Sequence, residues 1–563
     1  MSGGRSKFAL MSRRNSAIDR ATAIANATTR SAHHVAEASN RPAFRAERAA
    51  LSPQRRADLL DQLRGGQRKG GPYDLIVVGA GVTGAGVALD AVTRGLRVLL
   101  VDKVDLAFGT SRWSSKLAHG GLRYLASGNV GIARRSAKER GILMETTAPH
   151  LTRALPQVVP VMAKFGVLNN VLPRLGFLAG DALRIAAGTS AQTLPRSRTI
   201  SARKVAELCP AVDRAEVKFG YVNYDGQLTD DAALVTALAR TAAGYGADVL
   251  THAPVTQVTS EQGLSHVTLQ FGPDTRDTVT VAAAGVINAT GVWAGDLDKR
   301  VTVTPSRGTH LVIRSEKLGN PTGALTVPVP HATNRFCFVL PTGLGRCYVG
   351  ITDEAAPLAD EPEAPETDIH FILDVINQAL DKKLTRSDVD GAFAGLRPLI
   401  ELAENKEHTA DLSREHAILV EDGMVTVTGG KLTEYRLMAE QTVDAVLADP
   451  TIGSRLTGKY GPCVTERTPL LGAPGLPDVA PDSAAYTEQC VIPDPGQPAL
   501  PGSSISRARM SFAVTHEGAR TVGDILDRRT RIGLIPEDRA AATAAAEEVL
   551  RAARVEGVGP TPA

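Results

Sequence analysis

The chain of 563 residues is 43% apolar and 22% charged, and its formal net charge is +3. This length predicts two or three domains, and the apolar fraction excludes wholesale disorder. Five scattered cysteines without CxxC spacing argue against a disulfide framework and a thiolate zinc site, so no metal is expected. No uncharged apolar run approaches the ~20 residues that span a bilayer, and we recognise no secretory signal, so we expect a cytoplasmic protein.

The first 70 residues are strongly basic, with 14 Lys and Arg against 5 Asp and Glu. This Arg- and Ser-rich composition suits a transit peptide, but a disordered extension is the simpler interpretation, which we adopt for residues 1–70. Near the end of this stretch, LSPQRRADLLDQLR (residues 51–64) predicts the first helix, with Ser52 as N-cap and Pro53 at the first helical position.

Residues 73–103 read YDLIVVGAGVTGAGVALDAVTRGLRVLLVDK, which predicts a strand, a helix and a second strand. The first turn holds Gly79, Gly81 and Gly84 in G-x-G-x-x-G spacing, and these glycines let the backbone approach a pyrophosphate at a helix N-terminus. Asp102 ends the second strand, 18 residues after Gly84, and can accept hydrogen bonds from ribose hydroxyls. With strand, helix and acid in register, the segment predicts a dinucleotide site.

Two more strand-and-glycine segments lie far downstream, in residues 286–295 (VINATGVWAG) and 425–440 (VTVTGGKLTEYRLMAE). The turn of the first segment consists of Ala289, Thr290 and Gly291. Three such segments, dispersed this widely, favour a long cofactor threaded through one discontinuous domain. They therefore favour FAD over NAD.

In the second downstream segment a helix follows Gly430 and Lys431. The helix N-terminus and the lysine would stabilise negative charge on the N1–C2=O edge of a reduced flavin. A simple strand-to-helix connection is the alternative interpretation.

Five further motifs follow the fingerprint in chain order: FGTSRWSSKLAHGGLRYL (108–125), SRGTHLVI (306–313), GITDEAAP (350–357), GLRPLI (395–400) and TGGKLTEYR (428–436). Together they closely resemble the FAD-dependent, quinone-linked glycerol-3-phosphate dehydrogenases over residues 73–445. Residues 512–534 resemble the helical C-terminal domain of that family. No calcium-binding pattern follows them, as it usually does in mitochondrial members, so the bacterial type is favoured.

The fold class expected from these signals is α/β, with a Rossmann-type FAD-binding domain that is discontinuous in sequence. The expected division is an FAD-binding domain (71–200, 225–300 and 391–447), a β-rich substrate or cap domain (201–224 and 301–390), and a linker with a helical C-terminal domain (448–563). Residues 227–249 predict a helix with Thr229 as its N-cap.

In the family, the segment after the ribose acid runs beneath the isoalloxazine ring. A Cβ on Gly120 or Gly121 would collide with that ring, so the resemblance implies that both glycines face it. The other flavin contacts that the resemblance implies are Lys103, Thr110, Ser111, Ser114, Ser115, Lys116, His119, Leu432 and Thr433.

The resemblance also implies an anionic substrate. Arg123 is the first choice for its phosphate, because a guanidinium can bind it through two hydrogen bonds; a structural ion pair is the alternative. The other expected substrate contacts are Tyr124, Arg335, Arg397 and Arg414, of which Arg335 is the weakest. His310 is expected to be the base, assisted by Arg397 and Lys431, although a lone strand histidine is often structural.

The expected reaction is oxidation of sn-glycerol 3-phosphate to dihydroxyacetone phosphate, with hydride transfer to FAD and reoxidation by a membrane quinone. A glycerol-3-phosphate oxidase that uses O₂ and a non-catalytic flavin-binding redox sensor are the alternatives. The basic C-terminal helix interleaves acidic residues and lacks an aromatic platform, so no nucleic acid is expected. The sequence does not decide whether the protein forms a homodimer.

A quinone reductase must reach the bilayer, so we expect a monotopic protein on the anionic inner face of the cell membrane. Residues 155–188 are the best docking segment, because their charges are few: Lys164, Arg174, Asp181 and Arg184. Pro173, Gly176 and Gly180 break the segment too often for one long helix. The side chains expected in the lipid boundary are Phe165, Leu168, Leu172, Leu175, Phe177 and Leu178. A buried helical pair is the alternative.

Overall fold

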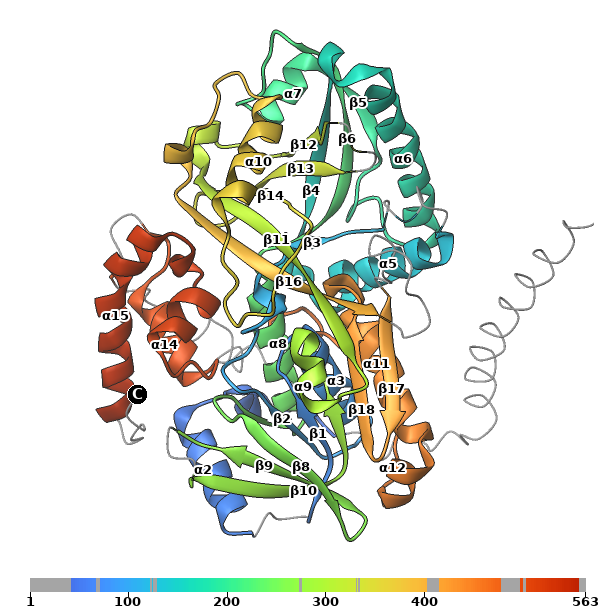
Figure 1. The fold of residues 1–563 in the computed structure, drawn as a ribbon, viewed down its shortest axis with the longest axis vertical. Helices are drawn as coiled ribbons and strands as arrows, with labels where there is room; N and C mark the ends of the chain where they lie inside the picture. The colour runs from blue at the N-terminus through green and yellow to red at the C-terminus, as the bar shows by residue number, and fades with distance from the viewer. Residues whose placement is uncertain are drawn as a thin grey trace, which may run out of the picture.

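The structure, a computed structural model, describes residues 42–66, 71–121, 124, 129–272, 276–330, 332, 335–401, 415–476, 497–499 and 503–555. Two β-sheets lie one above the other, with helices around them, and the C-terminal helices stand beside their junction (Figure 1). This arrangement confirms the α/β class.

The lower sheet has eight strands and is built around the predicted dinucleotide fold. Its order is β17-β18-β10-β1-β2-β7, with β9 on β10 and β8 on β9. β1 pairs in parallel with β2 and β10 and is buried throughout, as the apolar run from Leu75 to Val78 predicts. The strands are β1 (Tyr73–Val78), β2 (Val98–Val101), β7 (Asp248–Leu250), β8 (Val255–Glu261), β9 (Leu264–Gln270), β10 (Thr278–Asn288), β17 (His416–Glu421) and β18 (Met424–Gly429).

Helices cover both faces of this sheet. On one face, α3 (Val82–Thr93), α8 (Asp231–Gly244) and α11 (Tyr435–Ala448) share one hydrophobic core with β1 and β2. On the other face, α2 (Pro53–Arg64) buries Leu59 and Leu63 against residues of β9 and β10. The short helices α9 (Ala294–Leu297) and α12 (Pro450–Arg455) follow β10 and α11.

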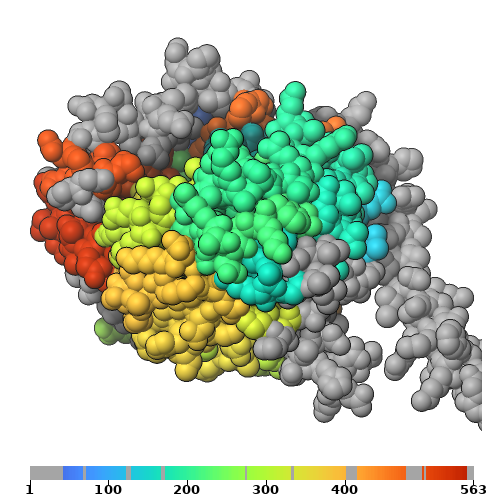
Figure 2. Space-filling view, turned by 90° about the horizontal axis from the view of Figure 1, so that it is seen from above, coloured from blue at the N-terminus to red at the C-terminus, as the bar shows by residue number. Residues whose placement is uncertain are grey.

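The upper sheet has ten strands, in the order β15-β11-β14-β13-β12-β4-β6-β3, with β16 on β11 and β5 on β6. The strands are β3 (Leu117–Ala118), β4 (Thr152–Met162), β5 (Arg198–Ser201), β6 (Val217–Leu228), β11 (Thr302–Arg314), β12 (Ala324–Pro328), β13 (Phe336–Pro341), β14 (Arg346–Gly350), β15 (Glu354–Ala355) and β16 (Gly391–Glu401). Its outer face packs on α7 (Ala202–Leu208) and α10 (Glu366–Asn377). Seen from above, their green and yellow surfaces lie side by side (Figure 2).

The strand pairing moves the domain boundaries that the sequence suggested. The sequence assigns residues 151–200 and 391–401 to the FAD-binding domain, but β4 and β5 pair with β6, and β16 pairs with β11, all in the upper sheet. These segments were recognisable as strands, but a strand's pairing partner cannot be read from one sequence alone.

The start of the chain also differs from the expectation. Residues 42–50, assigned to the disordered extension, instead include a short 3-10 helix (Ala46–Ala49), whereas the helix predicted over residues 51–64 is present as α2. Phe44 is buried and packs edge-on against Tyr245, with ring centroids 5.3 Å apart. Ser52 caps α2 as predicted, since its Oγ accepts the Arg55 N–H at 3.2 Å. Residues 1–41 lie outside the described part.

One helix start and one helix interior differ from what the sequence predicts. Asp230, and not Thr229, caps α8, because its carboxylate accepts the Ala232 N–H at 2.9 Å. The docking segment forms β4 and then a single 21-residue helix, α6 (Gly166–Ala186), with Pro173 inside it. Burial of Phe177 and Leu183 against the rest of the fold offsets the weak helix propensity of its proline and glycines. Among the described residues, no helix is long and apolar enough to cross a membrane.

The remaining helices are α5 (Val130–Ile142), beside α6, and the C-terminal helices α14 (Arg507–Thr515) and α15 (Pro536–Val555). A hydrophobic cluster of Met510, Ile525 and Ala546 joins the C-terminal elements into one body.

Candidate active site

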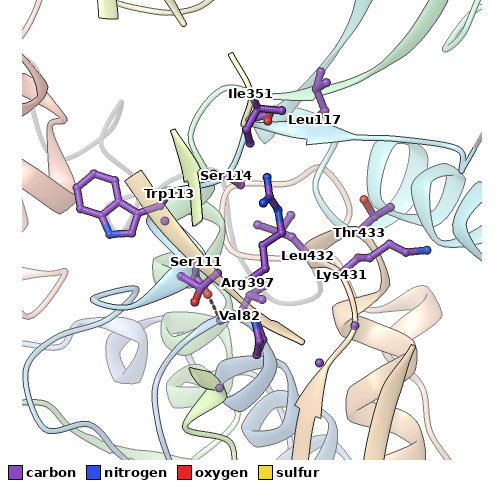
Figure 3. A pocket seen from close by; sticks show the side chains of 18 of the residues that line it. Val82, Ser111, Trp113, Ser114, Leu117, Ile351, Arg397, Lys431, Leu432 and Thr433 are labelled. Atoms are coloured by element: carbon purple, nitrogen blue, oxygen red, sulfur yellow. Dashed lines mark hydrogen bonds between the residues drawn. The ribbon is translucent and has the colours of Figure 1, made fainter. Parts of the chain in front are cut away.

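A large cavity of about 1280 Å³ lies between the two sheets. Its floor is formed by the carboxyl ends of β1, β2, β10 and β18, and its roof by residues of β4, β11, β12, β13 and β16. In close view, Arg397 rises through the centre, and Lys431, Leu432 and Thr433 enter from the turn on one side (Figure 3).

The G-x-G-x-x-G turn forms one end of this cavity. Gly79 has φ +101°, and a Cβ on Gly84 would strike the Gly79 carbonyl oxygen, so both positions require glycine. Ser111 joins the turn, because its Oγ accepts the Val82 N–H at the start of α3 at 2.9 Å (Figure 3). The glycines that the sequence singled out therefore form a tight turn at the cavity.

Asp102 lines the cavity at the end of β2. Its carboxylate accepts the N–H groups of Ala80 at 2.7 Å and Val104 at 2.9 Å, which fixes its orientation. Burial raises the pKa of Asp102 to about 6, although these two hydrogen bonds oppose the shift. Such a carboxylate is positioned to accept hydrogen bonds from a ribose.

The other two glycine turns also reach the cavity. Ala289, Thr290 and Gly291 line it after β10, and the Thr290 hydroxyl donates to Asn288 Oδ1 at 2.7 Å. Gly429 and Gly430 both have positive φ (82° and 72°) and turn the chain into a helical segment that begins at Leu432. Leu432 and Thr433 line the cavity at this helix start, as expected.

Lys103 and Trp293 form a shelf next to Asp102. The Lys103 ammonium lies 4.4 Å from the Trp293 ring centroid and 2.7 Å from Asp360 Oδ1. A Cβ on Gly109 would come within 2.8 Å of the same ring. The sequence analysis quoted Trp293 within VINATGVWAG but gave it no role; its place two residues after the glycine turn was the available signal.

Three residues expected to contact the flavin are not among those that line the cavity. Lys116 is 1% exposed; its ammonium pairs with Asp231 at 3.0 Å, and burial lowers the pKa of Lys116 to about 8. A Cβ on Gly120 would strike the Arg140 guanidinium, and one on Gly121 would meet Ala133 and Ser136 of α5. These glycines therefore make room for α5, a contact that local sequence cannot reveal.

Ser114 and Ser115 line the cavity, and Thr110 lines it nearby. The Thr110 hydroxyl donates to the Leu396 carbonyl at 2.7 Å and so links this segment to β16. Ser114 donates to Asp231 Oδ2 at 2.7 Å, which leaves the carboxylate bridging Ser114 and Lys116.

His310 does not line the cavity and so does not meet the geometric requirement for the expected base. It is 1% exposed, stacks on Phe393, and its Nε2 lies 2.9 Å from Ser115 Oγ. Burial, followed by the positive charges of Lys116 and Arg397, lowers the pKa of His310 to about 3. A neutral His310 therefore orients Ser115, which does reach the cavity.

His119 is the histidine that lines the cavity within the described part of the chain. Burial lowers its pKa, and the charge of Asp225 opposes that shift. Asp225 also lines the cavity, accepts from Arg140 at 2.6 Å and from the Gly120 N–H at 3.1 Å. The sequence analysis missed Asp225, which comes from β6, 85 residues beyond Arg140.

Two of the arginines expected to bind the substrate line the cavity. Arg397 is held by Asp353 at 3.2 Å and by the Thr352 carbonyl at 3.1 Å, and a Cβ on Gly308 would collide with its guanidinium. Arg335 is 42% exposed and lies 3.9 Å from Glu354. Arg123 and Arg414 lie outside the described residues.

Lys431 lies at the same end of the cavity as Tyr124. Its ammonium stands 3.9 Å from the Tyr124 ring centroid and donates to Ser136 Oγ at 3.1 Å and Glu434 Oε1 at 3.2 Å. Burial lowers the pKa of Lys431, against the charge of Glu434. A cation, an aromatic ring and a carboxylate thus meet beside the Gly429–Gly430 turn.

Comparison with known proteins decides the family. A family model described as FAD dependent oxidoreductase matches residues 74–435. Glycerol-3-phosphate dehydrogenase 1 of Mycobacterium tuberculosis (strain ATCC 25618 / H37Rv) is 50% identical over 523 residues, which cover 89% of this chain and 98% of that protein. The chain belongs to the glycerol-3-phosphate dehydrogenases of the FAD-dependent oxidoreductase family.

Similarity to other members of the family supports this assignment. The mitochondrial glycerol-3-phosphate dehydrogenase of Arabidopsis thaliana is 37% identical over 432 residues, covering 72% of this chain and 64% of that protein. The crystal structure of the glycerol-3-phosphate dehydrogenase from Bacillus halodurans complexed with FAD aligns with TM-score 0.66 and 25% identity, covering 90% of this chain and 94% of that one. An L-alpha-glycerophosphate oxidase from Mycoplasma pneumoniae shares the fold, with TM-score 0.51 and 16% identity over 71% of this chain and 98% of that chain.

The cofactor of the family is FAD, and the residues present fit it. Three glycine turns from separate parts of the chain converge on one cavity, each at the carboxyl end of a strand. Gly79 and Gly84 leave no room for a side chain, and Asp102 presents an oriented carboxylate beside them. FAD would be held by these turns, by Asp102 and by the helix start at Leu432.

Proposed function

We propose that this chain oxidises sn-glycerol 3-phosphate at C2 to dihydroxyacetone phosphate. The names of its relatives support the substrate, and one observation carries the proposal: cations from separate segments line the same cavity as the flavin cradle. A bound FAD would supply the acceptor for the C2 hydrogen as a hydride, and a side chain of the protein would take the proton of the C2 hydroxyl. The remaining requirements are a phosphate site and a base.

Arg397 is the best placed of the described residues to bind the phosphate. Asp353 and the Thr352 carbonyl hold its guanidinium, and Gly308 leaves the space it occupies. A fixed guanidinium can bind a phosphate through two parallel hydrogen bonds. Arg335 is a second contact at the more exposed side of the cavity. Arg123 and Arg414 remain proposed ligands from the resemblance.

His119 is the proposed base in place of His310. A base must reach the proton it removes, and His119 lines the cavity whereas His310 lies behind Ser115. The lowered pKa of His119 keeps it unprotonated near neutral pH, and the Asp225 carboxylate would stabilise the imidazolium that forms. Lys431 and the helix start beside it would stabilise negative charge on the flavin.

The proposed electron acceptor is a membrane quinone, and the proposed location is the inner surface of the cell membrane. Use of O₂ by an oxidase is the competing function; the likeness to the Mycoplasma oxidase, at 16% identity, supports only a shared fold. A non-catalytic redox sensor is disfavoured, because a sensor would not need Arg397 and Lys431 in the flavin cavity.

Anaerobic titration of the FAD-loaded protein tests this function. We expect sn-glycerol 3-phosphate to bleach the flavin absorbance, and glycerol 2-phosphate, which has no secondary hydroxyl, to leave it unchanged. Reoxidation by a quinone or by O₂ with release of peroxide then separates dehydrogenase from oxidase. Retained yellow colour at saturating substrate would reject the proposed reaction.

A further inference from the structure

One wall of the cavity is a tight turn that the C-terminal body (residues 503–555) supports from behind. Trp113, Ser114 and Ser115 line the cavity, and we call these three residues the wall turn. In close view, Trp113 lies across the cavity from Lys431 (Figure 3). The wall turn belongs to no helix or strand, so its position depends on the groups that hold its backbone and its side chains.

Two buried cations hold the carbonyl oxygen of Arg112, directly before the wall turn. Arg531 Nη2 donates to this oxygen at 2.7 Å, and Lys116 Nζ donates to it at 3.1 Å. Lys116 also donates to the Ser114 carbonyl at 3.1 Å, so it closes the turn from the other end. Arg531 is 5% exposed and comes from the C-terminal body, 419 positions further along the chain.

Both cations have a backbone conformation that residues with a Cβ rarely adopt. Lys116 has φ +58° and Arg531 has φ +59°, in the left-handed region. This conformation is unfavourable and persists only where the surrounding contacts require it. For Arg531 these contacts include β14, because Arg346 Nη1 donates to the Arg531 carbonyl at 2.8 Å. The upper sheet thus fixes the backbone from which the Arg531 side chain reaches the wall turn.

Two carboxylates at the start of α8 balance these cations. Asp231 is fully buried, pairs with Lys116 at 3.0 Å and accepts the Ser114 hydroxyl at 2.7 Å. Asp230 pairs with Arg531, with Oδ1 and Nε 3.8 Å apart. Buried charges are stable when they are paired and hydrogen-bonded, as they are here. Of the four charged groups behind the wall turn, Arg531 is the one that belongs to the C-terminal body.

On its other side the wall turn rests on the upper sheet. The Trp113 ring stacks on Phe393 of β16, with ring centroids 5.4 Å apart. A Cβ on Gly395 of the same strand would strike the Trp113 Cβ. Ser115 Oγ lies 2.9 Å from His310 Nε2 of β11. The turn is therefore held from two sides, by packing on these strands and by the charged groups behind it.

We propose that Arg531 is a positioning residue for the flavin site, which fixes the wall turn so that Trp113 and Ser115 are presented to FAD in one orientation. Arg531 is not among the residues that line the cavity, so the C-terminal body acts on the site through the Arg112 carbonyl. FAD is the cofactor of the family, and the inference does not depend on the identity of the substrate or of the electron acceptor.

Arg531→Gly tests this inference, because glycine adopts a positive φ without strain and the variant loses only the side chain. The visible circular dichroism of bound FAD is the deciding measurement. We expect Arg531→Gly to change this spectrum and to weaken FAD binding about tenfold, because the wall turn no longer has a fixed position. Arg539→Ala is the matched control, since its pair with Asp527 at 3.0 Å lies within the C-terminal body. It should leave the spectrum unchanged and FAD affinity within twofold of the wild type.

The wall turn can also be followed without FAD. The chain has two tryptophans, so Trp293→Phe leaves Trp113 as the fluorescent indole of the full-length apoprotein. In this background we expect Arg531→Gly to raise the acrylamide quenching constant at least twofold, and Arg539→Ala to leave it unchanged.

Arg531→Lys keeps the positive charge beside Asp230, but it has one ammonium where the guanidinium donates through two nitrogens. We expect smaller changes in the same direction as for Arg531→Gly. A wild-type flavin spectrum in Arg531→Gly would overturn the inference, even if its stability to urea is lower, because the residue would then be only structural. If Arg531→Gly does not fold, a wild-type spectrum and wild-type quenching in Arg531→Lys would overturn it.

Discussion

His119 and His310 show how two histidines in similar sequence surroundings acquire different roles. Each lies next to or near glycine, and neither motif reveals which imidazole reaches the substrate. The fold turns His310 behind Ser115, where it stacks on Phe393, and leaves His119 on the cavity wall beside Asp225. Access, and not residue type, decides which one can accept a proton.

Substitution of the two histidines separates these roles. We expect His119→Asn to lower kcat by ~10²–10⁴-fold, because the proton acceptor is lost, and His310→Asn to lower it less than tenfold. A base works only when unprotonated, so activity falls as the pH drops below its pKa. With a pKa of about 3, His310 cannot cause a fall in the neutral range.

The measurement is kcat against pH for both variants, with flavin content as the control. His310→Asn should keep the wild-type profile, whereas His119→Asn should lose any acidic limb. If His310→Asn loses the acidic limb and His119→Asn keeps the wild-type profile, His310 is the base.

At the level of elements, the sequence was most informative for structures that depend on one continuous segment of the chain. The strand, glycine turn and helix of residues 73–94 form as predicted, because an apolar run and a glycine pattern are local properties. Pairings between distant residues were out of reach: Arg140 meets Asp225, and Arg436 meets Glu139 across 297 positions of sequence. For the same reason, the sequence could not predict that β4 pairs with β6 or that Gly120 makes room for α5.

Helix α6 shows that the sequence could not predict which side chains of the docking segment are exposed. Phe165 and Phe177, expected in lipid, are buried, and side chains of 167–171 lie outside the described part. Two cations of this segment are engaged within the protein, because Arg184 donates to the Thr189 carbonyl at 2.7 Å and Arg174 to Ser197 Oγ at 3.0 Å. Of the expected side chains, Leu172, Leu175 and Leu178 are exposed, and Ile185 adds to this apolar surface.

We therefore predict that Leu175, Leu178 and Ile185 together anchor the protein to lipid. The triple replacement by serine should lower the bound fraction on anionic vesicles at least tenfold, because apolar area buried in the interface drives such binding. Vesicle sedimentation measures this, and bleaching by substrate should be retained. Leu358→Ser, at a 46% exposed leucine outside α6, is the control. Equal sedimentation of triple variant and control would place the membrane surface elsewhere.

Across the whole molecule, the C-terminal helical body is tied to the flavin cradle through buried charges. Asp105 is fully buried and accepts from Arg528 Nε at 2.7 Å and from Arg529 Nη2 at 2.8 Å. Asp105 lies three residues after Asp102, on the segment that begins at the end of β2. The same body reaches the upper sheet, where Asp538 pairs with Arg346 at 2.6 Å. It therefore fastens both sheets around the cavity.

Removing the charge of Asp105 should weaken both the fold and cofactor binding. Asp105→Asn leaves the buried Arg529 without its paired carboxylate and Arg528 with Asp524 alone, so we expect the free energy of unfolding to fall by ~3–5 kcal/mol. FAD affinity should fall with it, because the segment that orients Asp102 loses its anchor. Asp277→Asn is the matched control: its pair with Arg64 at 2.8 Å is solvent-exposed, so its loss should cost less than ~1 kcal/mol. Urea unfolding of the apoprotein and flavin titration report the two effects separately. If the variant unfolds like the control but binds FAD weakly, Asp105 acts on the cradle alone. If both the unfolding free energy and the FAD affinity match those of the control, the C-terminal body has no role in cofactor binding.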